Sequence, residues 1–163
     1  MKKVFKFMMM ALAAVVLTVG FAACSSDDDD DNGGSKPEPT EKASYLEMNF
    51  SFSEDMLSLF DLTVTYTDAD GSTKTETIST VDYSKKVDYT KAPATISYEV
   101  KAAKKANYPT KNSYAIKISY SHKISKNGEY GSGGISTTTT IKGDKVEDLF
   151  KLYDGKKVFG GSK

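Results

Sequence analysis

The 163-residue sequence contains no arginine and no tryptophan, and it has only one cysteine and one histidine. Arginine supplies most bidentate contacts to phosphates, so its absence argues against a phosphate-handling function. A single histidine excludes metal sites built on several histidines, and a single cysteine excludes an internal disulfide. The 22 basic residues, all lysine, are matched by 22 acidic residues. This balance gives no indication of a nucleic-acid partner.

The first segment of the chain has the pattern of an export signal. Three lysines, Lys2, Lys3 and Lys6, precede an apolar stretch over residues 8–23 that is short for a membrane-spanning helix. The small residues Ala22 and Ala23 stand where a signal peptidase cuts. We therefore expect residues 1–23 to be a signal peptide that is removed from the mature protein.

The only cysteine, Cys24, ends the motif "FAAC" and precedes the acidic run "SSDDDDD". Together these residues resemble the lipobox and export signal of surface-exposed bacterial lipoproteins of the Bacteroidota type, although leucine is usual where Phe21 stands. The resemblance implies that Cys24 carries the acyl chains of the anchor, palmitate among them, and that the protein sits in the outer membrane facing the cell exterior. It also implies that five residues form the export signal: Asp27, Asp28, Asp29, Asp30 and Asp31. A plain solvated tail is the alternative interpretation of the aspartates.

The stretch after the lipobox has the composition of a spacer. Residues 24–44 contain no large apolar side chain and cannot contribute to a core. We expect a flexible acidic tether with a reach of about 25 Å. Removal of residues 1–23 takes away three of the 22 lysines and no acidic residue, so the mature chain has a net charge of 19 − 22, or −3.

The pattern over residues 45–163 predicts one all-β domain. Apolar and polar side chains alternate over residues 46–52, 60–66, 96–102 and 114–124. The dipeptides Asp70-Gly71 and Asn127-Gly128 favour tight hairpins, with returning strands over 72–79 and 135–141. Strands with one apolar face must pack as two sheets or close into a barrel. We favour an antiparallel β-sandwich that is immunoglobulin-like in strand count only, because the tryptophan and the cysteine pair of antibody domains are missing.

One stretch near the end of the chain has a helical period. Four apolar residues recur there at helical spacing: Val146, Leu149, Phe150 and Tyr153. Asp144 can cap such a helix, and Gly155 can end it. The sequence therefore predicts one short C-terminal helix, followed by a final strand or tail.

Little in the chain indicates catalysis. His122 is in phase with Tyr120 and Ile124 on a strand, which predicts a partly buried, hydrogen-bonded histidine. No G-x-S-x-G motif accompanies it, and Ser132 stands in a glycine-rich segment. Three carboxylates lie on strands in the polar phase, without an apolar pocket to raise a pKa: Glu47, Asp61 and Glu99. We therefore predict a protein that is not an enzyme, with no catalytic residue, no metal site and no cofactor.

The ten tyrosines provide the candidate ligand-binding residues. Four of them stand among lysine, serine, asparagine and glycine, and we expect them in loops: Tyr83, Tyr89, Tyr108 and Tyr130. Exposed tyrosine rings offer flat faces to a sugar or a partner protein at low entropic cost. The alternative is that these rings cover the ends of the core.

Two functions remain open at this level. The first is a non-enzymatic surface binding module, accessory to glycan capture, with a polysaccharide as ligand. The second is a structural, adhesin-type or inhibitory lipoprotein with a protein partner, which could pair with an exposed strand such as residues 73–79.

Overall fold

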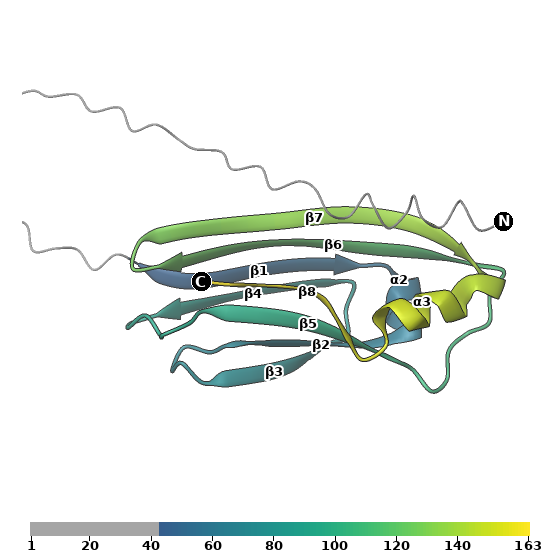
Figure 1. Ribbon diagram of the computed structural model, residues 1–163, viewed down its shortest axis with the longest axis horizontal. Helices are drawn as coiled ribbons and strands as arrows, with labels where there is room; N and C mark the ends of the chain where they lie inside the picture. Colours follow the sequence, from purple (N-terminus) through teal and green to yellow (C-terminus); the bar gives the residue numbers. More distant parts are fainter. Residues whose placement is uncertain (1–42) are drawn as a thin grey trace, which may run out of the picture. The chain divides into compact units, whose positions relative to one another are not determined.

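The computed structural model describes residues 43–163, which fold into two antiparallel sheets of four strands packed face to face (Figure 1). Sheet A has the order β4-β1-β6-β7, and sheet B has the order β3-β2-β5-β8. The strands of sheet A are β1 (Ser44–Phe52), β4 (Asp82–Tyr89), β6 (Ser113–Lys126) and β7 (Glu129–Lys142). Those of sheet B are β2 (Phe60–Thr67), β3 (Thr73–Ile78), β5 (Ser97–Lys104) and β8 (Lys156–Ser162).

This architecture confirms the predicted all-β antiparallel sandwich. The expectations for the signal peptide, Cys24 and residues 27–31 lie outside the described residues, and among those described no helix is long and apolar enough to cross a membrane.

The core forms where the apolar phases of the two sheets meet. Along β1 the side chains alternate strictly between buried and half-buried, with Leu46, Met48, Phe50 and Phe52 turned inward. No buried side-chain nitrogen or oxygen atom of residues 43–163 lacks a hydrogen-bond partner. The described residues therefore have a complete core of their own, and we expect a chain that contains them to fold without the first 24 residues.

Both predicted hairpins are present. Asn127 and Gly128, with φ angles of 51° and 78°, join β6 to β7, and such positive angles are what a two-residue hairpin turn requires. Gly71, with φ of 84°, stands in the turn between β2 and β3, where its N–H donates to the Asp68 carbonyl at 2.9 Å.

One of the eight strands, β4, was not predicted, and the final segment, which the sequence left open as a strand or a tail, is the strand β8. β4 is an edge strand in which only Val87 and Tyr89 are buried, so its lysines and serine hide the alternation. β8 is also an edge strand, and Phe159 is its one buried residue. Edge strands have fewer neighbours to bury their side chains against, and their sequence patterns are correspondingly weak.

The predicted C-terminal helix is confirmed as α3 (Val146–Tyr153), which follows a 3₁₀ turn, η1 (Gly143–Lys145). The expected cap is wrong: Asp144 lies within the 3₁₀ turn, and Lys145 holds the cap position without a side-chain hydrogen bond. A second short helix, α2 (Glu54–Leu59), was not predicted. The Ser53 hydroxyl caps it by accepting a hydrogen bond from the Met56 N–H at 3.2 Å.

A polar cluster joins the two sheets on the side where β3 and β4 form the edges. The Glu76 carboxylate of β3 accepts hydrogen bonds from the Tyr66 hydroxyl at 2.6 Å, the Tyr83 hydroxyl at 2.9 Å and the Lys85 ammonium at 3.0 Å. Tyr83 and Lys85 belong to sheet A, whereas Tyr66 and Glu76 belong to sheet B. The hydrogen bond from Tyr66 is the largest of the effects that lower the pKa of Glu76, from 4.5 to about 2.

We expect Glu76→Gln to lower the free energy of unfolding by about 1–3 kcal/mol at neutral pH, because it weakens hydrogen bonds to a charged group. A carboxyl whose pKa is depressed on folding stabilises the protein above its unfolded pKa and loses this effect as the pH falls through its folded pKa. The difference between wild type and variant should therefore be complete above about pH 4.5 and shrink toward pH 2. Urea titrations at several pH values measure it.

The matched control is Glu99→Gln on the outer face of β5, where the carboxylate forms an exposed ion pair with Lys101. We expect this change to stay within about 0.5 kcal/mol. Equal effects of the two substitutions would contradict the role assigned to Glu76.

Candidate functional site

The structure corrects the placement of the candidate tyrosines. Tyr83 and Tyr89 lie on β4, and Tyr130 lies on β7, so the prediction that they occupy loops is wrong for these three. Only Tyr108 lies in a loop. The outward side chains of this edge strand are polar, and Lys85 in the inward phase reaches Glu76 of sheet B, so the segment looked like a loop.

The four rings do not form one surface. Tyr89 is 6% exposed and donates a hydrogen bond to the Thr67 carbonyl at 2.7 Å. The ring of Tyr83 stacks on Phe50 with centroids 5.4 Å apart. Tyr108 packs edge-on against Phe150, with centroids 5.0 Å apart. Three of the rings therefore complete the core, as the alternative interpretation had it, and Tyr130, 55% exposed, is the one that faces solvent.

His122 is a half-buried strand residue with a hydrogen bond, as predicted. Its Nδ1 lies 2.8 Å from the hydroxyl of Tyr98, across the interior of the sandwich. A Cβ added to Gly133, its neighbour on β7, would come within 2.7 Å of the imidazole, so a larger residue there would have to displace this ring. Burial lowers the pKa of His122 and favours the neutral form. The contacts hold the ring in place inside the fold.

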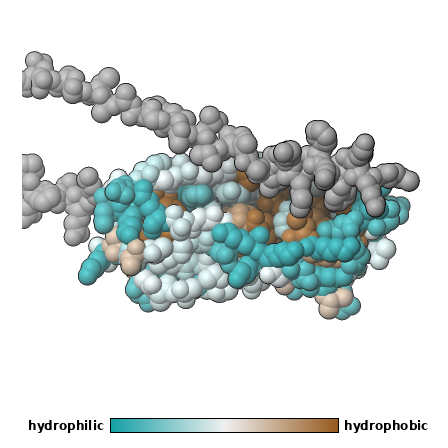
Figure 2. All heavy atoms as spheres, in the orientation of Figure 1, coloured by the Kyte–Doolittle hydropathy of each residue, from teal (hydrophilic) through white to brown (hydrophobic). Residues whose placement is uncertain are grey.

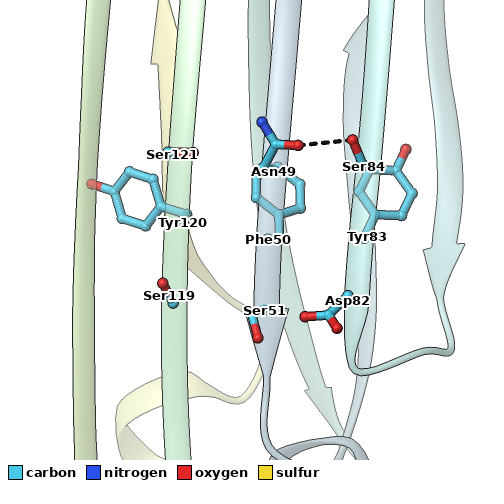
Figure 3. Close-up of a pocket in the computed structure, with 9 residues that line it drawn as sticks. All are labelled: Asn49, Phe50, Ser51, Asp82, Tyr83, Ser84, Ser119, Tyr120 and Ser121. Atoms are coloured by element: carbon cyan, nitrogen blue, oxygen red, sulfur yellow. Dashed lines mark hydrogen bonds between the residues drawn. The ribbon is translucent and has the colours of Figure 1, made fainter.

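A shallow hollow of about 400 Å³ lies on the outer face of sheet A, over the middle of β4, β1 and β6 (Figure 3). Antiparallel register brings two rows of small outward side chains together there. The first row is Ser84, Asn49 and Ser121, and the second is Asp82, Ser51 and Ser119. We call these six residues the hydroxyl hollow. Beneath them, the inward phase of the same strands carries Tyr83, Phe50 and Tyr120.

The hollow exists because longer side chains border the two small rows. The preceding row across the face consists of Lys86, Glu47 and Lys123, and the Lys123 ammonium lies 3.6 Å from the Glu47 carboxylate. On the other side the Lys117 ammonium donates to the Ser51 hydroxyl at 3.0 Å. Serines between lysines and glutamate leave a depression on an otherwise flat sheet.

The chemistry of the hydroxyl hollow is polar and largely uncharged. The Ser84 hydroxyl donates to the Asn49 side-chain carbonyl at 2.7 Å, which fixes the amide across β1 and β4 (Figure 3). The Asn49 amide nitrogen reaches Glu47 at 3.4 Å, a long and weak contact. Serine hydroxyls both donate and accept hydrogen bonds, and an amide offers both kinds of group. Asp82 is the single carboxylate of the lining.

Two tyrosines lie on the same outer face, near the turn between β6 and β7. Tyr45 of β1 and Tyr130 of β7 are both paired with Ser125 of β6, so the three residues form one row. Residues two strands apart in a sheet are separated by about 9–10 Å. The Lys86 ammonium lies over the ring of Tyr45, 5.5 Å from the ring centroid. The face therefore combines a hydroxyl-lined hollow with aromatic rings at one end.

Comparison with known proteins gives no relative: no family model, no curated protein and no solved structure matches the chain. Between residues 43 and 163, no group of three or more His, Cys, Asp or Glu side chains is placed to hold a metal ion.

Proposed function

We propose that this protein is a non-enzymatic binding module, anchored in the outer membrane through lipid on Cys24 and exposed on the cell surface, whose ligand is an uncharged, hydroxyl-rich chain such as a polysaccharide. The observation that carries the proposal is the hydroxyl hollow on the outer face of sheet A. The anchor rests on the resemblance of the "FAAC" motif and the aspartate run to surface lipoproteins.

The composition of the hollow favours a neutral ligand. Serine hydroxyls and the Asn49 amide can exchange hydrogen bonds with sugar hydroxyls, which are donors and acceptors in the same way. No cationic side chain is among the lining residues, and the lysines at its borders already have partners: Glu47 for Lys123, Ser51 for Lys117 and Asp88 for Lys86. A ligand with many hydroxyls therefore meets matching partners without displacing a buried charge.

The shape of the face favours a chain over a small molecule. Most of a drug-sized ligand is enclosed in its pocket, whereas this hollow is shallow and lies on an open sheet. The three strands that line it span about 10 Å, the distance between the first and third strands of a sheet. Tyr45 and Tyr130 extend the same face toward the hairpin turn and offer ring surfaces to a second part of the chain.

The non-enzymatic part of the proposal is supported by the positions of the groups that could act in catalysis. Glycoside hydrolysis ordinarily needs two carboxyl groups facing one bond, and Asp82 is the only carboxylate that lines the hollow. His122 lies in the inward phase of β6, on the opposite side of the sheet, with Nδ1 engaged by Tyr98.

A structural, adhesin-type or inhibitory role with a protein partner is the second candidate. One observation favours it: the outer edge of β7 is long and uncharged from Tyr130 to Ile141. The edge anticipated from the sequence, residues 73–79, does form an edge strand as β3, but Lys74 and Glu76 give it charge.

The experiment that tests glycan binding is electrophoresis of residues 25–163 through gels cast with host, plant and microbial polysaccharides. We expect retardation on at least one neutral polymer. The double variant Asn49→Ala/Ser84→Ala should bind that polymer about tenfold more weakly, because each lost hydrogen bond contributes about 0.5–1.5 kcal/mol. Both side chains are on the surface of the sheet, so the variant should keep its fold.

The matched control is Thr63→Ala/Thr77→Ala, which removes two hydroxyls paired across β2 and β3 on the outer face of sheet B. This variant should run like wild type. If no polymer slows the migration of the wild type, the glycan proposal is overturned. If both double variants lose affinity for the polymer equally, the binding site is not the hydroxyl hollow.

A further inference from the structure

The strand β7 forms an edge of sheet A that lacks the usual protection. All fourteen of its residues pair with β6 in one continuous register. The segment from Tyr130 to Ile141, "YGSGGISTTTTI", contains no charged residue and no proline. Within the part of the chain that the structure describes, β7 pairs with no other strand, and Figure 1 shows it along the border of the sandwich. Such a strand presents a row of backbone donors and acceptors to any other strand.

The other three edges differ from β7. The edge strand β4 carries four charged side chains in eight residues: Asp82, Lys85, Lys86 and Asp88. The strand β3 has only six residues and includes Lys74 and Glu76. The strand β8 begins with Lys156 and Lys157, and its register against β5 shifts at Val100 and Lys101. Charges, short length and irregular register are the devices that keep edges from pairing. Of the four edge strands, only β7 lacks all of these devices between Tyr130 and Ile141. We infer from this difference that the β7 edge pairs with another strand.

The inward phase of β7 also carries two isoleucines that the rest of the fold does not fully cover. Ile135 is 47% exposed, although it pairs with Tyr120 on the face that packs against the core. Ile141 lies on the same face and is half-buried. Figure 2 shows apolar surface on this side of the molecule, in the part that lies between β7 and α3 in Figure 1. A partner strand beside β7 would cover this surface as well as the backbone edge.

We propose that β7 pairs antiparallel with β7 of a second copy of this chain, so that two sheets A join into one continuous sheet. A two-fold axis perpendicular to the sheet gives this arrangement, in which the same patch serves both copies. Inward residues then lie opposite inward residues, and outward ones opposite outward ones. Only registers that keep this match are compatible with two intact cores.

The sequence of β7 selects one register among these. With Thr138 opposite itself on the axis, Ile135 of each copy lies opposite Ile141 of the other, and Thr137 lies opposite Thr139. Both isoleucines of each strand thus gain an apolar neighbour, which no other face-matched register achieves. Threonines directly opposite each other can hydrogen-bond across the strands and stabilise such a pair. Lys142 falls opposite Gly134, so no like charges meet.

The paired segment runs from Gly134 to Lys142, which makes a small interface. Contacts below about 1,200 Å² of total buried area belong to the weak, reversible class. A membrane anchor favours such pairing, because it confines the copies to one surface and raises their effective concentration. We therefore expect a dimer that forms reversibly in solution and is captured by a cross-link.

The test uses cysteine substitutions in residues 25–163, a chain that otherwise has no cysteine. Side chains directly opposite in an antiparallel pair have Cβ atoms about 4.5–5.5 Å apart, close to the geometry of a disulfide. Under mild copper–phenanthroline oxidation, Thr138→Cys should give a reducible dimer as its main product. Thr137→Cys and Thr139→Cys should cross-link little when alone and efficiently when mixed.

The control is Thr77→Cys, which places a thiol on an exposed residue of the β3 edge. It should remain monomeric under the same oxidation, and circular dichroism should show all variants folded.

Sedimentation of the wild type should shift from monomer toward dimer as concentration rises. Cross-linking of Thr138→Cys no greater than that of Thr77→Cys would overturn the proposal and leave β7 to a strand of another protein. Failure of the mixed Thr137→Cys and Thr139→Cys pair would overturn the register. None of these results depends on glycan binding.

Discussion

Replacing Cys24 with serine is expected to release the protein from the membrane fraction almost completely. The proposed anchor consists of acyl chains on this one thiol, and each buried methylene contributes about 0.8 kcal/mol to membrane binding. Serine cannot form the thioether to which the lipid is attached, so the whole contribution should disappear in a single step. The measurement is partition of the chain between detergent and aqueous phases, combined with labelling by palmitate.

A second variant separates anchoring from display on the surface. Changing residues 27–31 from aspartate to asparagine leaves Cys24 intact, so the protein should keep its label and its place in the detergent phase. It should lose accessibility to protease added to whole cells, because the acidic run is proposed as the export signal. Palmitate labelling of Cys24→Ser equal to wild type would contradict the anchor, and full surface exposure of the asparagine variant would support a plain solvated tail.

The second large effect is expected from Phe50→Ala. Phe50 is 3% exposed, and its ring lies 5.4 Å from Tyr83, 5.7 Å from Tyr98 and 5.0 Å from Phe159, measured between centroids. These contacts reach β4 in the same sheet and β5 and β8 in the opposite one. Deletion of a buried phenylalanine ring lowers the free energy of unfolding by about 3–5 kcal/mol, because it loses burial and leaves a cavity. Urea unfolding of residues 25–163 measures this loss.

The control for Phe50 is Phe50→Leu, which keeps an apolar side chain in the same place. We expect it to retain most of the stability, because it leaves a smaller cavity than alanine does. Since Phe50 also underlies the hydroxyl hollow, the leucine variant should still bind its polysaccharide. A loss below about 1 kcal/mol in Phe50→Ala would contradict the assignment of this ring as the link between the sheets.

The fold could be predicted from the sequence where local rules decide the structure. Strict alternation identified β1 and β2, and Asn127-Gly128 identified the longest hairpin, because the turn needs the positive φ angles that these residues tolerate. The strand β4 was missed because one of its faces is mostly charged and only Val87 and Tyr89 are buried. Its position beside β1 comes from tertiary pairing, which local pattern does not encode.

The candidate site could not be found by the same rules. The hydroxyl hollow takes its residues from three segments, 49–51, 82–84 and 119–121, which are far apart in the sequence. Each segment alone looks like the ordinary polar phase of a strand, and only the register between strands brings the serines into two adjacent rows. The candidate tyrosines were chosen one by one from their sequence neighbours. Tyr89 is instead a core residue, and its hydroxyl donates a hydrogen bond to the Thr67 carbonyl.

The two proposals reinforce each other on the outer face of sheet A. A two-fold axis perpendicular to the joined sheets places both hydroxyl hollows on the same side. A polysaccharide chain could then contact both copies, and linked sites bind more tightly than either does alone. Disruption of the β7 pair should therefore weaken binding to long polymers more than binding to short oligosaccharides.

The measurement that tests the central claim most directly is amide NMR mapping of residues 25–163 with an oligosaccharide of the retarding polymer. The account predicts that the largest shift changes fall on the two rows of the hydroxyl hollow: Ser84, Asn49, Ser121, Asp82, Ser51 and Ser119. Amides on the outer face of sheet B, such as those of Thr63 and Thr77, should stay unchanged. Changes confined to sheet B or to the α3 end, or no change at saturating ligand, would contradict it.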